Sequence, residues 1–305
     1  MPTSKSQVLV ITAPGHAPCL NDTLTDTITR FLAKDAVIDR RWLSAGEAWE
    51  LRFVNQADGG RHLAQQAKTV LLGLPVDLNI LPGDPETRRK RLLIADMDST
   101  IIEQECIDEI AEYAGVRKEV SEITERAMRG ELDFEQALAS RVSLLEGLPT
   151  SIFEEIIATR LSIMPGAVTL VQTMKANGAM AALVSGGFTA FTSRISEIVG
   201  FEFNQANTLG TAEGHLTGTV EQPILGKEAK LAALKSYAAE AGIPLTSTLA
   251  IGDGANDLAM IKAAGLGIAY RAKPIVAEAA RASIRHGNLE TALYLQGYKR
   301  SEFVD

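Results

Sequence analysis

The feature that constrains this chain most is a short apolar run that ends in two aspartates. Residues 92–95 (Leu-Leu-Ile-Ala) lead directly into Asp96-Met97-Asp98-Ser99-Thr100. A continuous apolar run bounded by polar residues is typical of a strand that is buried on both faces, as in a parallel sheet. In open α/β sheets, ligands bind beyond the carboxyl ends of such strands. The sequence therefore places Asp96 and Asp98 where chemistry is expected.

The close spacing of the two carboxylates requires an explanation, because they repel each other. At a separation of 4 Å they repel each other by roughly 1–4 kcal/mol, depending on the effective dielectric constant. The simplest reason is a bound Mg²⁺ ion, which takes carboxylate oxygens, water and substrate phosphate as ligands. The ordinary alternative is an aspartate that caps a helix, followed by a second one in solvent. The pair alone leaves both readings open.

Strands and helices alternate from residue 92 onward. We expect strands at 92–96, 180–184, 247–251, 267–270 and 282–285, further strands within 201–220, and helices at 166–177, 188–199, 226–241, 274–281 and 289–296. This alternation predicts an α/β fold with a doubly wound parallel sheet. A mostly helical stretch at about 104–162 is inserted after the first strand. It is too long for a loop, so we expect a helical cap over the crevice.

Residues 1–85 form a separate small α+β domain in our interpretation, and residues 86–305 the catalytic domain. We expect strands at 7–13, 36–43 and 76–81, helices at 20–33 and 60–68, and a polar, Gly-rich stretch after residue 43. This order resembles an ACT-like or ferredoxin-like module, although no motif fixes it. Pro82-Gly83-Asp84-Pro85 reads as a linker, and the basic run 88–91 that follows it is expected to be solvated.

Composition narrows the functional classes. With 305 residues, 46% of them hydrophobic and 22% charged, the chain is typical of a globular protein with an ample core. The net charge of −8 argues against nucleic acid or an anionic membrane as a partner, but a small anionic substrate needs only a few local cations. The two cysteines, the lack of a signal-peptide pattern and the lack of a membrane-length apolar stretch predict a cytoplasmic protein.

Three predicted strands end in acidic, small or polar residues: Asp96 and Asp98, then Ser185-Gly186, then Asp253, Asn256 and Asp257. On a parallel sheet these ends meet at one edge. Ser185 reads either as a turn or cap residue or, beside Gly186, as part of a phosphate contact at a helix N-terminus. A phosphate site also needs a cation. We assign Lys227, which opens the helix before the third strand end, and expect Lys230, one turn later, to face solvent.

Four ordered motifs resemble those of the haloacid dehalogenase superfamily. Asp96-Met97-Asp98-Ser99-Thr100 is similar to the first motif (Asp-x-Asp-x-Thr), Ser185 to the second, Lys227 to the third, and 252–257 (Gly-Asp-Gly-Ala-Asn-Asp) to the fourth. In the cap, Glu105, Met128, Phe134 and Arg141, with their neighbours, look like the branch of the superfamily whose members hydrolyse O-phospho-L-serine. The resemblance covers about residues 88–296 and does not specify the first 85.

The resemblance implies a mechanism. Asp96 is expected to be the nucleophile that forms an aspartyl-phosphate, and Asp98 the acid and then the base. Mg²⁺ is expected on the Asp96 and Asp253 carboxylates and the Asp98 backbone carbonyl, with Asp257 supporting these ligands from outside. Lys227 is expected to offset the negative charge. Ser185, Gly186 and Asn256 are expected to hold phosphate oxygens.

The cap residues are expected to select the substrate. The resemblance implies that Glu105 binds the ammonium group, Arg141 the carboxylate, and that Met128 and Phe134 exclude water. From the residues alone, the ordinary interpretation is favoured: Glu105 is a first-turn acid, Arg141 a surface cation, and Met128 and Phe134 belong to the core of the cap. The implied reaction is the last step of serine biosynthesis. Its rivals are hydrolysis of another small phosphomonoester, transfer to an acceptor such as homoserine, or a serine-sensing regulator. ACT-like modules often pair, which suggests a homodimer.

Overall fold

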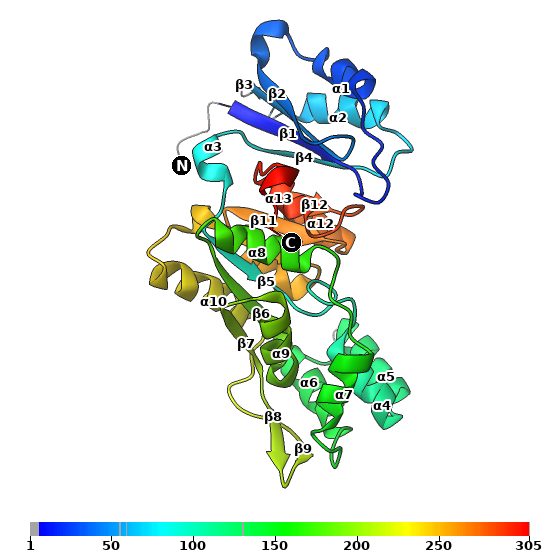
Figure 1. Cartoon of the computed structure of the whole chain (residues 1–305). Helices are drawn as coiled ribbons and strands as arrows, with labels where there is room; N and C mark the ends of the chain where they lie inside the picture. Colours follow the sequence, from blue (N-terminus) through cyan, green and yellow to red (C-terminus); the bar gives the residue numbers. More distant parts are fainter. Residues whose placement is uncertain (1–5, 55, 59, 130, 305) are drawn as a thin grey trace.

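A six-stranded parallel sheet forms the centre of the molecule (Figure 1). The structure, a computed structural model, describes residues 6–54, 56–58, 60–129 and 131–304, apart from the side chains of Met128 and Lys227. In sheet order, the strands are β12 (Ala282–Ile284), β11 (Leu266–Tyr270), β10 (Thr248–Gly252), β5 (Leu92–Ala95), β6 (Met180–Phe188) and β7 (Phe203–Asn207). All neighbouring pairs are parallel, which confirms the predicted α/β sheet.

Helices cover both faces of this sheet. They are α8 (Ala167–Ala176), α9 (Thr189–Val199), α10 (Lys227–Glu240), α11 (Leu258–Ala263), α12 (Pro274–Ala279) and α13 (Thr291–Leu295). The four residues of β5 are fully buried: Leu93 and Ala95 pack in the core that includes α8 and α9, and Leu92 and Ile94 in the core that includes α10 and α11. Burial on both faces explains why the sequence of β5 is continuously apolar.

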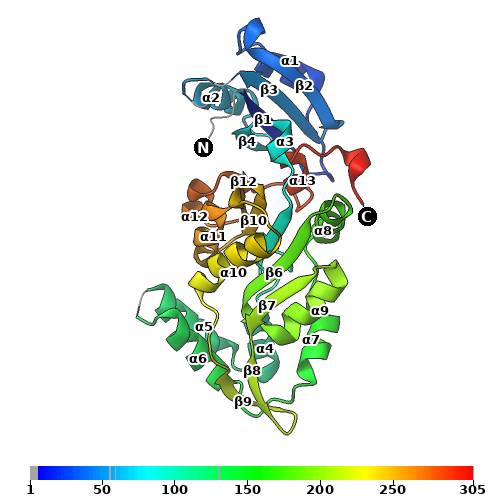
Figure 2. The same cartoon turned by 90° about the vertical axis from the view of Figure 1, so that its left-hand side faces the viewer.

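A helical cap follows β5, as predicted. It consists of α4 (Cys106–Ala114), α5 (Arg117–Met128), α6 (Phe134–Ser143) and α7 (Ile152–Thr159). A hairpin of β8 (Leu209–Ala212) and β9 (His215–Val220) follows the edge strand β7 and reaches the cap, as Figures 1 and 2 show. The Gly147 and Thr150 amides each donate a 2.8 Å hydrogen bond to hairpin carbonyls. Among the described helices, none is long and apolar enough to cross a membrane.

The N-terminal part forms a second, antiparallel sheet in the order β2-β3-β1-β4. Its elements are β1 (Ser6–Thr12), α1 (Asp22–Thr29), β2 (Val37–Ser44), β3 (Ala48–Val54), α2 (Arg61–Val70) and β4 (Asp77–Pro82). This β-α-β-β-α-β order is ferredoxin-like. Our interpretation of the stretch after residue 43 as only polar and Gly-rich is wrong, because β3 lies within it. Glu50 and Arg52 interrupt its apolar pattern, yet Glu50 is buried in an ion pair.

One face of this second sheet packs on α1 and α2, and the other meets the catalytic part of the chain. Leu9 and Ile11 belong to the core between this sheet and its helices α1 and α2, whereas Val8, Val10 and Leu81 join the core of the central sheet. The connection runs through α3 (Pro85–Arg88). The expectation of a solvated basic run is wrong for Arg88 and Lys90, which are only 8% and 9% exposed, because Arg88 pairs with Glu50 and Lys90 binds two backbone carbonyls.

Candidate active site

A pocket of about 270 Å³ lies between the carboxyl edge of the central sheet and the helical cap. Most of the predicted site residues line it: Asp96, Asp98, Glu105, Phe134, Arg141, Ser185, Gly186, Asp253 and Asn256. The strand ends of β5, β6 and β10 supply the floor, and α4 and α6 supply the cap side. Seven further lining residues were not among the predicted site residues, namely Ile107, Leu138, Gly187, Phe188, Gly254, Ala255 and Lys273. The structure therefore brings three distant strand ends and the cap to one place.

Asp96 is held by a buried lysine on α10. Lys230 Nζ lies 2.6 Å from Asp96 Oδ1 and 2.6 Å from Asp257 Oδ1, and the lysine is 2% exposed. Burial acts to lower the pKa of Lys230, but the charges of Asp96 and Asp257 outweigh it and raise this pKa above its ordinary value. Our expectation that Lys230 faces solvent is therefore wrong. The side chain of Lys227, to which we assigned this role, lies outside the described residues.

Asp98 is positioned on two sides. Ser185 Oγ donates to its Oδ2 over 3.2 Å, and the Cys106 amide at the start of α4 donates to its Oδ1 over 2.9 Å. Burial and the neighbouring charge of Asp96 raise the pKa of Asp98 to about 6. Gly187 packs closely here, because a Cβ atom at this position would lie 2.8 Å from Asp98 Oδ2. The arrangement gives Asp98 a fixed orientation and a pKa near neutrality, as an acid–base residue requires.

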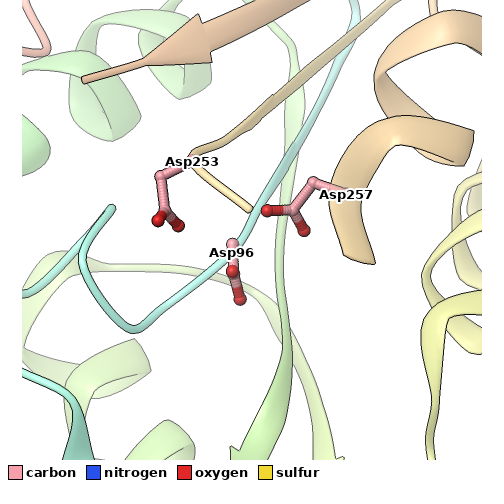
Figure 3. Close-up of side chains that lie close together, drawn as sticks. All are labelled: Asp96, Asp253 and Asp257. Atoms are coloured by element: carbon pink, nitrogen blue, oxygen red, sulfur yellow. The ribbon is translucent and has the colours of Figure 1, made fainter. Parts of the chain in front are cut away.

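Asp96, Asp253 and Asp257 point toward one another from β5 and from the loop after β10 (Figure 3). One oxygen of each lies within 4.8 Å of the others. Asp257 is already engaged, with Lys230 on one oxygen and the Gly254 amide on the other. Asp253 accepts a 3.4 Å hydrogen bond from Thr100, and burial and the charge of Asp96 raise its pKa to about 6.

This donor set fits a hard cation. Asp96 and Asp253 offer carboxylate oxygens in a crowded acidic corner, where a cation lowers their mutual repulsion. Asp257 instead orients Lys230. A Cβ atom at Gly252 would lie 2.4 Å from Asp257 Cγ, so the glycine is what allows this carboxylate to lie against the end of β10. The site can therefore hold Mg²⁺ on Asp96 and Asp253, with Asp257 behind them.

Glu105 and Arg141 provide opposite charges on the cap side of the pocket. Glu105 accepts a 2.6 Å hydrogen bond from Ser99, whose backbone is in the left-handed region (φ 55°). Burial and the charge of Asp98 raise the pKa of Glu105 to about 7. Arg141 is half-buried, which lowers its pKa, and no described carboxylate forms an ion pair with it. Its guanidinium is thus available to an anion in the pocket.

Phe134 forms an apolar wall at the pocket entrance. Its side chain is 39% exposed, and its ring edge would lie 3.5 Å from a Cβ atom placed at Gly186. The absence of a side chain at residue 186 thus leaves room for both the ring and a ligand. Met128, which we expected beside Phe134, has a side chain outside the described residues.

Comparison with known proteins agrees with this geometry. Residues 93–262 match the haloacid dehalogenase-like hydrolases. The chain is 47% identical to a phosphoserine phosphatase of Streptomyces coelicolor over 294 residues, which cover 96% of this chain and 71% of that protein. A crystal structure of a probable phosphoserine phosphatase from Vibrio cholerae superposes with a TM-score of 0.78, at 35% identity, over 97% of this chain and 87% of that one.

A substrate-bound phosphoserine phosphatase structure matches the catalytic part, with a TM-score of 0.63 and 44% identity over 68% of this chain and 98% of that one. The motifs, the central sheet with its cap, and these relatives lead to one assignment. The chain belongs to the haloacid dehalogenase-like hydrolases, in the family of the phosphoserine phosphatases.

Proposed function

We propose that this protein is an Mg²⁺-dependent phosphatase that hydrolyses O-phospho-L-serine to L-serine and inorganic phosphate. The observation that supports this most is the pocket itself. It has Asp96 and Asp98 on its floor. On its cap side it has a carboxylate, Glu105, and a guanidinium group, Arg141. Phosphoserine carries an ammonium and a carboxylate group, which Glu105 and Arg141 would complement, and a phosphate group, which Asp96 would attack.

In the first step, an Asp96 oxygen attacks phosphorus, and the bond from phosphorus to the serine oxygen breaks. Asp98 donates its proton to the leaving oxygen, as its raised pKa allows. In the second step, Asp98 takes a proton from water, whose oxygen attacks the aspartyl-phosphate and releases the Asp96 carboxylate. Lys230 keeps its charge beside Asp96 throughout and lowers the repulsion between the nucleophile and the phosphate.

The Asp96 and Asp253 carboxylates and the Asp98 backbone carbonyl would hold Mg²⁺, which offsets phosphate charge when it is bound. Ser185, Gly186 and Asn256 line the pocket, and we expect the Ser185 hydroxyl, the Gly186 amide and the Asn256 side chain to donate to phosphate oxygens. Such fixed donors stabilise charge in the transition state. Lys227 stays a prediction for the cation, and the contacts of Lys230 favour Lys230 for that role.

The test is phosphate release from L-phosphoserine, measured beside phosphothreonine and an aryl phosphate, each with Mg²⁺ and with EDTA. We expect fast, metal-dependent release with a clear preference for phosphoserine. Release from the aryl phosphate but not from phosphoserine would retain Asp96 as nucleophile and refute the roles of Glu105 and Arg141. If the phosphoryl group is transferred to homoserine and not to water, the protein is a phosphotransferase.

A further inference from the structure

A second charged cavity, of about 690 Å³, lies where the N-terminal sheet meets the catalytic part of the chain. Its walls come from β2 and β3, from the α3 connection and from the segment that follows α13. Both views show this C-terminal segment between the two sheets (Figures 1 and 2). We call it the seam cavity. It shares no lining residue with the active-site pocket.

Two arginines of the seam cavity, Arg41 and Arg88, share one carboxylate, and a third, Arg52, lies beside it without an ion pair in the described structure. Glu50 on β3 accepts from Arg41 Nε and from Arg88, each over 2.7 Å, so both of its oxygens are engaged. Arg52, two residues along β3 on the same face, makes no ion pair with any described carboxylate, and its Nε is buried without a hydrogen-bond partner. The Nε of Arg88 is also buried and unpartnered. The cluster therefore has more positive charge than its own acids balance.

The rest of the seam cavity does not remove this excess. Arg89 pairs with Glu302 over 2.6 Å, which leaves Lys299 and Asp39 as the remaining charged residues of the lining. Asp39 lies opposite Arg52 in the β2–β3 register, yet the two side chains are not in ion-pair contact in the described structure. Five cations thus face three carboxylates, a surplus of two positive charges.

This surplus is costly because the cluster is partly removed from water. Arg88 is 8% exposed and Glu50 is 4% exposed. Burial lowers the pKa of Arg88 in spite of its pairing with Glu50, and the charges of Arg41 and Arg52 lower it further. Arg88 also donates to the backbone carbonyls of Tyr294 and Leu295, so its charge is partly satisfied. The interactions that the described part of the chain does not supply are those of Arg52, and an anion that enters the cavity can supply them.

We propose that the seam cavity is a binding site for a compact polyanion, a small molecule with at least two negative charges on phosphate or carboxylate groups. Arg52 and Lys299 are its charge partners from the two sides of the cavity. Planar guanidinium groups bind phosphate and carboxylate oxygens in pairs, which favours such anions over chloride. The bound anion joins β3 to the C-terminal segment and thereby stabilises the contact between the N-terminal sheet and the catalytic part.

The experiment is calorimetric titration of the full-length protein with inorganic phosphate, sulfate and malonate, each against sodium chloride of matched ionic strength. We compare wild type with Arg52→Gln, Lys299→Gln and Arg40→Gln. Lys299 is exposed at the cavity edge, so its loss does not threaten folding, and Arg40 lies on β2 outside the cavity as a charge-matched control. Phosphate is also the product of the proposed reaction, so its competitive inhibition constant against phosphoserine reports the active site separately.

We expect wild type and Arg40→Gln to bind one polyanion in addition to any anion in the active site. Arg52→Gln and Lys299→Gln should each weaken this binding by about tenfold or more, without changing the competitive inhibition constant. Binding of phosphate and sulfate but not malonate identifies a phosphate-type ligand, and the converse a carboxylate ligand. Equal titrations for all four proteins, or heat that sodium chloride reproduces, overturn the proposal.

Discussion

The buried ammonium group of Lys230 holds two carboxylates that repel each other. Asp96 and Asp257 each lie 2.6 Å from it, and all three side chains are nearly inaccessible to solvent. Removal of one member from such a buried group leaves uncompensated charge and is strongly destabilising, by roughly 3–5 kcal/mol. Lys230 is therefore important both for the shape of the site and for the charge that faces the phosphate.

We predict that Lys230→Met lowers kcat on phosphoserine by roughly 10²–10³-fold, because the nucleophile loses its cation. Lys235→Met, on the exposed side of α10, should leave kcat unchanged. Steady-state kinetics measure the effect, and circular dichroism establishes that the variants are folded. Lys227→Met decides between the two assignments, since a loss of turnover in that variant and not in Lys230→Met would restore our first choice.

Arg141 gives a second prediction for a single residue. In Arg141→Ala, KM for phosphoserine should rise by roughly 10- to 100-fold, because a charge-assisted hydrogen bond contributes about 1.5–3 kcal/mol. KM for an aryl phosphate, which has no carboxylate group to bind, should barely change. Arg117→Ala, an exposed arginine of the cap, is the control. Equal increases for both substrates would exclude Arg141 from recognition of the amino acid.

At this scale, the sequence was informative where a residue's role follows from its position at a strand end. The structure brings Asp96, Asp98, Ser185 and Asp253 to one pocket, as this reasoning predicted, and their roles stay predictions. The sequence was misleading for Lys230 on α10, whose partner Asp96 lies 134 positions away in the sequence, directly after β5. Whether a lysine on a helix is solvated or buried depends on such partners, and the helical pattern does not contain them.

Whether a whole strand can be predicted from sequence also depends on partners that are distant in the chain. The strands β5, β10 and β11 of the central sheet were predictable because they are apolar on both faces, whereas β3 was not. Its residues Glu50 and Arg52 face the seam between the two sheets, where Arg88 supplies a partner for Glu50 from outside the strand. Charged residues at buried strand positions remove the alternation on which strand prediction depends. The local sequence pattern does not show which residues pack against β3, and the structure does.

The start of β5 gives a prediction about pH. Lys90 binds the carbonyls of Thr87 and Thr246, and burial, with the charges of Arg281 and Arg88, lowers its pKa from 10.5 to about 8. Between these two values the unfolded chain holds a proton that the folded protein has released. The free energy of unfolding therefore rises with pH in this window as far as Lys90 is concerned.

We predict that wild type gains stability relative to Lys90→Met when the pH is raised from 7.5 to 9.5. Urea unfolding at both pH values measures the difference, and the comparison cancels the other groups that titrate in this range. Lys262→Met, which removes an exposed lysine of α11, should show no such change. A difference between wild type and Lys90→Met that is independent of pH would show that the Lys90 ammonium is not desolvated by folding.

For the whole molecule, the main question is how the N-terminal sheet is attached. One of its faces packs on its own helices, whereas the other docks on the catalytic part through the apolar residues Val8, Val10 and Leu81 and through specific polar contacts. Asn79 exchanges hydrogen bonds with the Ser283 backbone of β12, and Tyr294 on α13 donates to Glu47. A division into domains 1–85 and 86–305 stays a prediction, but these contacts indicate that the two parts do not move freely. A rigid attachment is also what the seam cavity requires.

Asp77 makes the densest of these contacts and provides the test. Its buried carboxylate accepts hydrogen bonds from the backbone amides of Arg285, His286 and Gly287, at 2.9–3.3 Å. Asp77→Ala leaves these amides without their acceptor, so the free energy of unfolding should fall by roughly 1.5–3 kcal/mol. Hydrogen exchange at residues 285–287 should become faster, while Asp35→Ala, an exposed aspartate of the same domain, changes neither quantity. Unchanged exchange in Asp77→Ala would show that the N-terminal sheet is held by its apolar contacts alone.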